Sequence, residues 1–316
     1  MNILIGFEHN YLMPYGVMLQ SLIENNQGTT FHVYAIIGNN VTSQDKEQLR
    51  TIICQEKGNT VEFYNFEVKN ITKFPIQTWT HFRESCYYRL FAPSVLPEDI
   101  DKILYLDGDM IVCHDLTELW HIDISDYAVA GVMNQTEDVK CYNRLRYPMR
   151  KRYINNGVLL INLDYWRTNR LEEKFVDVIL NHPEMIVMAD QDVLNHVVQD
   201  SKLVLPLKYN VQEKFFYKLE NMTFDYWERK EEIEQAIHNP WIIHYAGNIK
   251  PWMVNCIHPL KEKFFEYRKM TNWRDDALLD NTPKVSFYEK TKTMIKRICF
   301  MKSPANTTIV SPFRLI

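Results

Sequence analysis

Short apolar segments of strand length alternate with segments of helical periodicity in the first part of this chain, and this alternation restricts the fold more than any other feature. Residues 3–7, 31–37 and 61–66 are runs of apolar, β-branched and aromatic residues, which are typical of strands. Residues 41–53 have the Thr/Ser start and the apolar spacing of a helix. The pattern predicts βαβ units, and therefore an α/β fold whose central sheet is mostly parallel and flanked by helices. Ligands of such sheets usually bind at the carboxyl ends of the strands.

The composition indicates a folded protein that binds a small molecule. The 316 residues are 46% hydrophobic and 24% charged, which is too apolar for a disordered chain and sufficient for one large domain or two ordinary ones. The net charge of −4 argues against a surface built for nucleic acid. Six cysteines without a CxxC pair fit neither a disulfide scaffold nor a zinc ribbon, so the cytoplasm is the expected location. The sequence also predicts neither a transmembrane helix nor a signal peptide.

An acidic pair interrupts the most apolar predicted strand. Residues 102–112 read KILYLDGDMIV, so that Asp107, Gly108 and Asp109 separate two apolar runs. In an extended segment the two carboxylates point to the same side and can share one divalent cation, and Gly108 permits close approach of a ligand. The alternative is a surface turn with two solvated acids. The apolar flanks favour the metal site, because carboxylates at the end of a buried strand need a compensating cation.

A histidine and a lysine are further candidates for this site, the first as a metal ligand and the second as a phosphate contact. His244 follows an apolar run within the predicted strand 241–247 and is a candidate third ligand, although a histidine there can also be an ordinary core residue. Two carboxylates and one imidazole form a mixed oxygen and nitrogen set, which suits Mn²⁺ better than Mg²⁺. Lys250 would neutralise a phosphate of the ligand, or else is simply an exposed lysine.

Five motifs give the sequence a specific resemblance. They occur in the order seen in glycosyltransferase family 8 and read SCYYRL (85–90), ILYLDGDMIV (103–112), INNGVLLINL (154–163), ADQDVLN (189–195) and HYAGNIKPW (244–252). Over residues 2–270 the chain resembles the bacterial lipopolysaccharide galactosyl- and glucosyltransferases and, more distantly, glycogenin. The resemblance implies a GT-A type domain over residues 1–270. Its implied activity is transfer of a hexose from a UDP-sugar to a saccharide hydroxyl, with retention of the anomeric configuration.

The resemblance also assigns roles to individual residues. Asp107, Asp109 and His244 match the family's Mn²⁺ ligands, with Mg²⁺ as the alternative ion. Lys250 and the backbone amide of Gly247 would face the phosphates of the donor. The other residues implied in binding UDP-glucose or UDP-galactose are Gly6, Glu8, Asn10, Arg89, Gly108, Asn155, Asp190 and Gln191.

Three of these residues are the catalytic candidates: Arg89, Asp190 and Gln191. Structural interpretations remain, because Arg89 can pair with an acid, Asn155 can shape a turn and Asp190 can cap its helix. Gln191 resembles the residue near the β-face of the anomeric carbon, where a double-displacement enzyme needs a carboxylate nucleophile. An amide is a poor nucleophile, so substitution at the front face is expected. Asp190 and Asp192 keep the covalent route open.

Two positions depart from the family's pattern. The sequence Glu8-His9-Asn10 stands where the family commonly has an Asp-Asp-Asn type segment. Glu8 can still accept a hydrogen bond from the uracil N3–H, so UDP remains the expected nucleotide. Asn134 lies where related enzymes often carry an aspartate that touches the acceptor, so the acceptor stays open. Residues 134–153 are polar and rich in Tyr and Arg, and we expect them to form a loop over the donor.

A basic tail follows the predicted domain and occupies residues 271–316. Its residues 281–316 carry seven Lys and Arg against one Glu. The segment 284–302 can lie on an anionic membrane as an amphipathic helix, which would bring the enzyme to a lipid-linked acceptor at the inner face of the membrane. The alternative is a helix that packs on the main domain.

Other functions remain open beside the synthesis of lipopolysaccharide or another surface glycan. The same site could serve a metal-dependent hydrolase of UDP-sugars, which would turn over without an acceptor. A non-catalytic protein that binds nucleotide sugars would be expected to have lost metal ligands, and none is lost here. Self-glycosylation of the kind seen in glycogenin also stays open, because the chain has 18 tyrosines.

Overall fold

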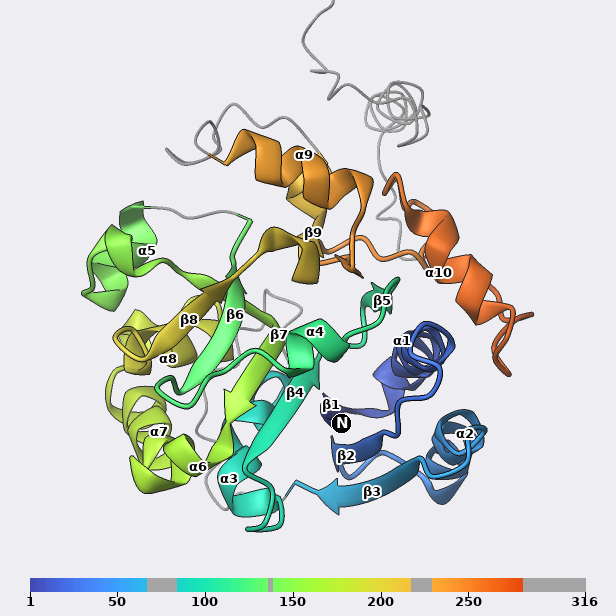
Figure 1. The fold of residues 1–316 in the computed structure, drawn as a ribbon, viewed down its shortest axis with the longest axis horizontal. Helices are drawn as coiled ribbons and strands as arrows, with labels where there is room; N and C mark the ends of the chain where they lie inside the picture. Colours follow the sequence, from blue (N-terminus) through green and yellow to red (C-terminus); the bar gives the residue numbers. More distant parts are fainter. Residues whose placement is uncertain (67–83, 136–138, 217–228, 281–316) are drawn as a thin grey trace, which may run out of the picture.

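The computed structural model describes residues 1–66, 84–135, 139–216 and 229–280. A seven-stranded sheet with the order β3-β2-β1-β4-β7-β6-β8 forms its centre (Figure 1). Its strands are β1 (Asn2–Phe7), β2 (His32–Ile37), β3 (Thr60–Asn65), β4 (Lys102–Leu106), β6 (Val129–Met133), β7 (Ile154–Asn162) and β8 (Lys202–Leu205). Only the pairings of β7 with β4 and β6 are antiparallel within this sheet. The expected α/β fold with a mostly parallel sheet is therefore confirmed.

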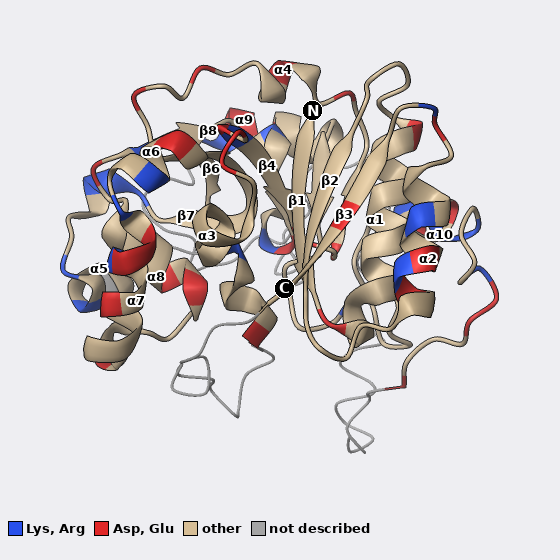
Figure 2. Cartoon of the chain, turned by 90° about the horizontal axis from the view of Figure 1, so that it is seen from below, with Lys and Arg blue, Asp and Glu red and all other residues tan. Residues whose placement is uncertain are grey.

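Helices cover both faces of this sheet, which Figure 2 shows nearly edge-on. On one side lie α1 (Leu12–Glu24), α2 (Ser43–Ile53) and α10 (Lys261–Arg268), and on the other α6 (Leu163–Thr168), α7 (Leu171–Asn181) and α8 (Asp190–Val197). Alternate residues of β1 serve the two cores: Ile3 and Ile5 pack in the cluster that includes α1 and α2, whereas Leu4 packs in the cluster that includes α7 and α8. This division follows from the two-residue period of a strand.

A second, three-stranded sheet carries the continuation of β4. It has the order β5-β10-β9, with β5 (Met110–Val112), β10 (Ile242–His244) and β9 (Val211–Gln212). The expectation of one extended strand over residues 102–112 is therefore wrong, because the chain bends at 107–109 and passes from one sheet to the other. The bend frees the two acids from the interior of a continuous strand and places them between the sheets.

Two expectations from the local sequence have different outcomes in the structure. The expected helix cap is confirmed: Thr42 and Asp45 form a reciprocal capping box at the start of α2. By contrast, β7 begins at Ile154, so that Asn155 and Asn156 lie inside the strand and Asn155 does not shape a turn. Both side chains are buried and hydrogen-bonded to other polar side chains, which removes the usual penalty for amides in a core strand.

The last described residues pack on the domain. The indole of Trp273 lies against α1 at Gly16, where any side chain would overlap its ring. Arg268 Nε donates to the Trp273 carbonyl at 2.8 Å, and Leu279 forms a β-bridge with Met253. No helix in the described ranges is long and apolar enough to cross a membrane. The part of the predicted tail from residue 281 onward lies outside the described residues.

Candidate active site

Three candidate metal ligands meet where β4, β5 and β10 come together. Asp107 follows β4, Asp109 precedes β5, and His244 is the last residue of β10. The antiparallel pairing of β10 with β5 places His244 opposite Met110, the residue after Asp109. One ligand atom from each of the three side chains lies within 4.8 Å of the others. The structure thus brings together residues that are separated by more than 130 positions in the sequence.

The imidazole of His244 is oriented by a buried amide. Its Nδ1 lies 2.9 Å from Asn210 Oδ1, so an Nδ1–H that donates to Asn210 leaves Nε2 free to bind a cation. That Nε2 faces Asp109 Oδ1 at 3.4 Å. Asn210 Nδ2 in turn donates to Asn155 Oδ1 at 2.9 Å, which fixes the orientation of the amide. Asn210 was not predicted from the sequence, because an isolated asparagine beside a short strand carries no signal of this role.

The charges of the site fit a divalent cation. Burial opposes ionisation of Asp109, but Lys250 and His244 hold the pKa of its carboxyl well below its usual range. Lys250 Nζ contacts Asp109 Oδ2 and donates to the Tyr245 carbonyl at 2.7 Å. The site therefore contains an anionic carboxylate that needs positive charge beside it. Two carboxylates and a correctly oriented imidazole are a donor set that Mn²⁺ accepts, so these residues fit the expected ion.

Arg89 joins Asp107 to a second polar group. This side chain comes from the 3₁₀ helix η3 (Glu84–Phe91) and is 6% exposed. Its Nη2 lies 3.1 Å from Asp107 Oδ1, and its Nε lies 3.2 Å from Asp190 Oδ2. Its Nη1 donates to the Asn156 carbonyl at 2.7 Å. The guanidinium therefore holds two carboxylates from different elements in fixed positions.

Two tyrosines support Asp107. The Tyr105 hydroxyl donates to Asp107 Oδ1 at 2.6 Å, and the guanidinium of Arg89 lies 4.0 Å above the Tyr105 ring. The ring of Tyr15 fills the space beside Gly108, where a Cβ would lie 2.7 Å from Tyr15 Cδ2. In this structure an aromatic ring is thus the close neighbour of Gly108. A contact between Gly108 and the donor stays a prediction.

Next to Arg89 lies a buried group of polar side chains. Asn155 Nδ2 donates to Gln191 Oε1 at 3.0 Å, and Asn156 Nδ2 donates to Asp190 Oδ2 at 2.8 Å. Burial raises the pKa of the Asp190 carboxyl to about 6, against the opposing effects of Arg89 and Asn156. Among the described residues, Gln191 Nε2 and Asn156 Oδ1 are buried without a hydrogen-bond partner. Unsatisfied buried groups of this kind suit a ligand with several hydroxyls.

A clamp around Asp192 presents Asp190 and Gln191. Asp192 is fully buried, and its carboxylate accepts hydrogen bonds from the Tyr153 hydroxyl, from Arg144 and from the backbone amides of residues 187 and 188. The turn that these contacts fix ends at Ala189, whose φ of 47° and ψ of −131° lie in a region that L residues avoid. Arg144 comes from α5 (Val139–Leu145), so part of the expected loop over residues 134–153 is helical.

The candidate nucleotide contacts lie at the carboxyl end of β1. The Tyr15 hydroxyl donates to the Gly6 carbonyl at 3.1 Å. Glu8 precedes the short 3₁₀ helix η1 (His9–Tyr11), which contains the exposed Asn10. Glu8 also lies beside Gly38, at which a Cβ would be 3.0 Å from Glu8 Cγ. Because β4 is parallel to β1, these residues and Asp107 share one edge of the sheet.

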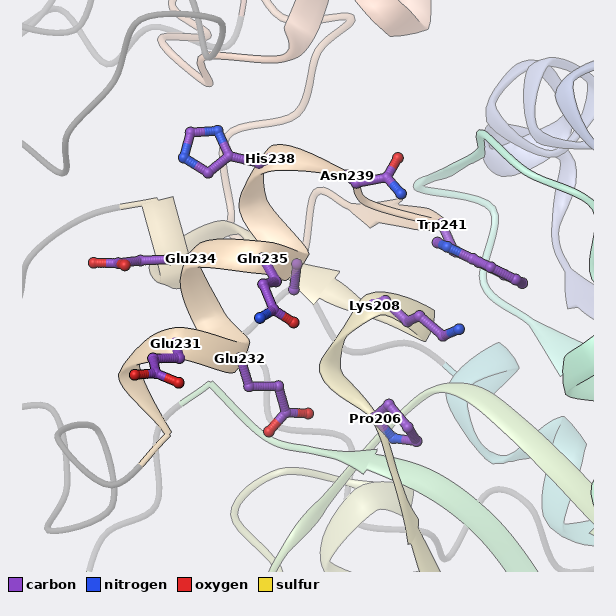
Figure 3. A pocket seen from close by; sticks show the side chains of 10 residues that line it. Pro206, Lys208, Glu231, Glu232, Glu234, Gln235, His238, Asn239 and Trp241 are labelled. Carbon is purple, nitrogen blue, oxygen red and sulfur yellow. The ribbon is translucent and has the colours of Figure 1, made fainter.

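A hollow of about 830 Å³ lies between η6 (Leu207–Tyr209) and α9 (Lys230–His238) (Figure 3). Several of its polar groups are engaged within the protein. Glu232 accepts from the Leu207 amide at 2.9 Å, and Lys208 lies 3.8 Å above the Trp241 ring. His114 stacks on the same indole at 5.4 Å. The lysine and the histidine both lie on the Trp241 indole, which is thus engaged within the protein.

Comparisons with known proteins identify the fold and the family. A sequence model described as Glycosyl transferase family 8 matches residues 2–256. The chain is 29% identical over 280 residues to general stress protein A of Bacillus subtilis, which covers 86% of this chain and 94% of that protein. It is 27% identical over 299 residues to lipopolysaccharide 1,2-glucosyltransferase of Escherichia coli K12, which covers 93% and 85% of the two proteins. Among solved structures, the galactosyltransferase LgtC in complex with donor and acceptor sugar analogs is similar at a TM-score of 0.76 and 21% identity, and the match covers 93% of this chain and 100% of LgtC.

Proposed function

The chain belongs to glycosyltransferase family 8 and has a GT-A type fold, and from this premise we propose that it transfers glucose or galactose from a UDP-sugar to a saccharide hydroxyl with retention of configuration. One observation carries the proposal. Asp107, Asp109 and His244 converge at the carboxyl end of β4, and Arg89 connects this cluster to the buried amides around Gln191. A cation-binding group beside a hydroxyl-binding group is the arrangement that a nucleotide sugar requires.

The residues on the phosphate side would neutralise the leaving group. Asp107, Asp109 and His244 would hold Mn²⁺, with Mg²⁺ as the second candidate, and the bound ion would supply positive charge to the diphosphate. Lys250 Nζ, which contacts Asp109 in the structure, would turn to a phosphate oxygen. The Gly247 backbone N–H would donate to a second phosphate oxygen. Glu8 and Asn10 would bind the uridine, since they extend from the end of the neighbouring strand β1.

The hexose would lie against Arg89, Asn155, Asp190 and Gln191. The buried Gln191 Nε2 and Asn156 Oδ1, which lack partners among the described residues, support this placement because sugar hydroxyls would satisfy both. Arg89 would contact the sugar and the phosphate together, since its guanidinium already contacts the acids on both sides.

We propose that retention results from substitution at the front face of the sugar. Gln191 offers an amide, which is a poor nucleophile, and both oxygens of Asp192 accept hydrogen bonds in the clamp that holds the preceding turn. The bond between the anomeric carbon and the donor phosphate would break while the acceptor oxygen forms its bond on the same face. The proton of the acceptor hydroxyl would pass to an oxygen of the departing phosphate.

The acceptor would be a saccharide of the bacterial surface, presented on a lipid. The activities named for the relatives support the saccharide, since they include lipopolysaccharide glucosyl- and galactosyltransferases. Exposed apolar side chains support the lipid: Val254 and Leu279 are 50% and 49% exposed and adjoin one another just before the basic segment 281–316. We place the catalytic domain at residues 1–270, and peripheral contact with the inner membrane face at residues 284–302 of the tail.

Release of UDP tests the proposal directly. Purified protein would be incubated with Mn²⁺, a panel of UDP-sugars and a lipid-linked saccharide extract, and UDP would be measured with and without EDTA. We expect chelator-sensitive release from UDP-glucose or UDP-galactose that depends on the extract. Release that is equally fast without any acceptor would instead indicate a hydrolase. Binding of a UDP-sugar without release of UDP under any condition would indicate a non-catalytic protein that binds nucleotide sugars.

A further inference from the structure

Glu213 is an acidic residue at the phosphate side of the site that neither the motifs nor the composition singled out. It follows β9 directly, in the 3₁₀ helix η7 (Glu213–Phe216). The strand β9 runs parallel to β10, with Gln212 opposite His244. The residues that follow the two strands therefore leave the sheet side by side, and Glu213 meets the segment that leads from His244 to Gly247.

The Glu213 carboxylate lies directly on Gly247. The Gly247 backbone N–H donates a hydrogen bond to it. The carboxylate packs so closely on the glycine that any side chain at position 247 would overlap Glu213 Oε2. Burial raises the pKa of this carboxyl, and Lys250, Lys214 and His244 oppose the rise. The Glu213 carboxylate thus lies among the groups that would face a phosphate, although it belongs to the protein.

The same two groups form the proposed phosphate site. The Gly247 N–H and Lys250 would contact the diphosphate of the donor, and the first already donates to Glu213. Two anions cannot share one backbone N–H, and a carboxylate within a few ångströms of a phosphate repels it strongly in a partly buried site. The Glu213 carboxylate must therefore leave Gly247 before a diphosphate can bind there.

We propose that Glu213 is an internal competitor of the donor diphosphate, which occupies the Gly247 amide in the donor-free protein and yields it when the donor binds. The inference rests on the proposed function, since it takes the diphosphate of a nucleotide sugar as the ligand. A nucleoside without phosphates would leave Glu213 in place. Glu213 is thereby a specificity residue, because the ligand must bring a diphosphate that outcompetes a tethered carboxylate.

The test compares ligands with and without phosphates on two variants. Isothermal titration calorimetry in the presence of Mn²⁺ would give the Kd of UDP and of uridine for the wild type, Glu213→Gln and Glu213→Ala. Glu231→Gln is the matched control, because it removes the same charge from an exposed position on α9. If Glu213 occupies the amide in nine-tenths of the donor-free molecules, its removal tightens UDP binding about tenfold.

The expected result is a lower Kd for UDP in Glu213→Ala, a smaller gain in Glu213→Gln, and no change for uridine or for the control. A Kd for UDP that is unchanged or higher in both variants would overturn the inference while leaving the proposed function intact. An equal gain for uridine would also overturn it, because the effect would then not concern the phosphates. Absence of UDP binding to the wild type would overturn the proposed function and the inference with it.

Discussion

At the scale of single residues, Arg89 has the largest number of roles in the site. Its guanidinium contacts Asp107 on the proposed metal side and Asp190 on the proposed sugar side, and it stacks on the Tyr105 ring. A planar group with several fixed donors can satisfy both acids at once, whereas the ammonium of lysine acts as a single point charge. Arg89 therefore sets the distance between the two halves of the site as well as their charge.

Replacement of Arg89 by lysine should reduce activity without changing the formal charge of the site. We expect kcat/KM for the UDP-sugar to fall by about 10²–10³, the usual effect of removing one well-placed donor from an active site. Arg50→Lys, at an exposed helix position whose guanidinium pairs with Glu47 and lies over the Phe63 ring, is the control and should leave kcat/KM unchanged. Activity of Arg89→Lys close to that of the wild type would contradict the bridging role.

A buried histidine makes the stability of the fold depend on pH. His258 packs at the edges of Tyr245 and Phe216, and burial lowers its pKa to about 3. In the unfolded chain the pKa is about 6.5, so below that pH the unfolded state binds a proton that the native state does not. The His258 contribution therefore destabilises the native state as the pH falls from about 6.5 toward 3, and it vanishes above 6.5.

Chemical denaturation at pH 7.5 and pH 5 measures this effect. Between the two pH values, His258→Asn should lose about 2 kcal/mol less free energy of unfolding than the wild type, because asparagine does not titrate. The exposed His238→Asn should behave as the wild type does. Equal losses in all three proteins would show that His258 is protonated in the folded state.

At the scale of elements, short segments from distant parts of the chain hold one another in position. The turn before α8 has the strained Ala189, and the Asp192 carboxylate fixes that turn through two backbone amides while Tyr153 and Arg144 hold the carboxylate. Strained backbone persists where the surroundings determine it, and such places concentrate at functional sites. Here the strain lies immediately before Asp190 and Gln191, the residues that would face the sugar.

The position of His244 beside β7 depends on a residue without a side chain. Gly157 of β7 lies under His244, and a Cβ there would be 2.5 Å from His244 Cε1 and from Met110 Cε. Gly157→Ala should displace the imidazole and weaken Mn²⁺ binding about 10- to 100-fold, as other changes around metal ligands do. Electron paramagnetic resonance of free Mn²⁺ in a titration would measure the affinity.

Gly131→Ala is a control from the same sheet. A Cβ at Gly131 would lie 3.0 Å from Ile154 Cδ1 and 3.1 Å from Leu159 Cδ2, which are ends of flexible side chains that can shift. This variant should keep the Mn²⁺ affinity of the wild type. If Gly157→Ala also kept it, His244 would not be a ligand in the geometry described here.

At the scale of the whole molecule, the sequence predicted what local patterns encode. The strands at residues 3–7, 31–37 and 61–66 lie within a residue of β1, β2 and β3, because each is a short run of apolar, β-branched and aromatic residues. The break between β4 and β5 was not predicted, since an apolar run on each side of two acids looks like one strand. The two apolar runs differ only in the strands with which they pair, and those strands are distant in the sequence.

The residues of the candidate site also comprise some that local sequence patterns predict and some that they do not. Asp107, Asp109 and His244 belong to motifs and could be named from the sequence, and the structure brings their ligand atoms together. Asn210 and Glu213 could not, because their roles depend on which strands lie side by side. A single polar residue next to a two-residue strand is too common to stand out, and only the tertiary structure shows that these two face His244 and Gly247.

The proposed metal-dependent nucleotide site is tested most directly by measuring UDP binding with and without metal. Calorimetry should show binding of UDP in Mn²⁺ that weakens at least about tenfold in EDTA and in Asp109→Asn, whereas the exposed Asp126→Asn keeps the wild-type Kd. This result would support a metal-dependent nucleotide site formed by Asp107, Asp109 and His244. Binding of equal strength without metal, or undiminished binding by Asp109→Asn, would contradict it.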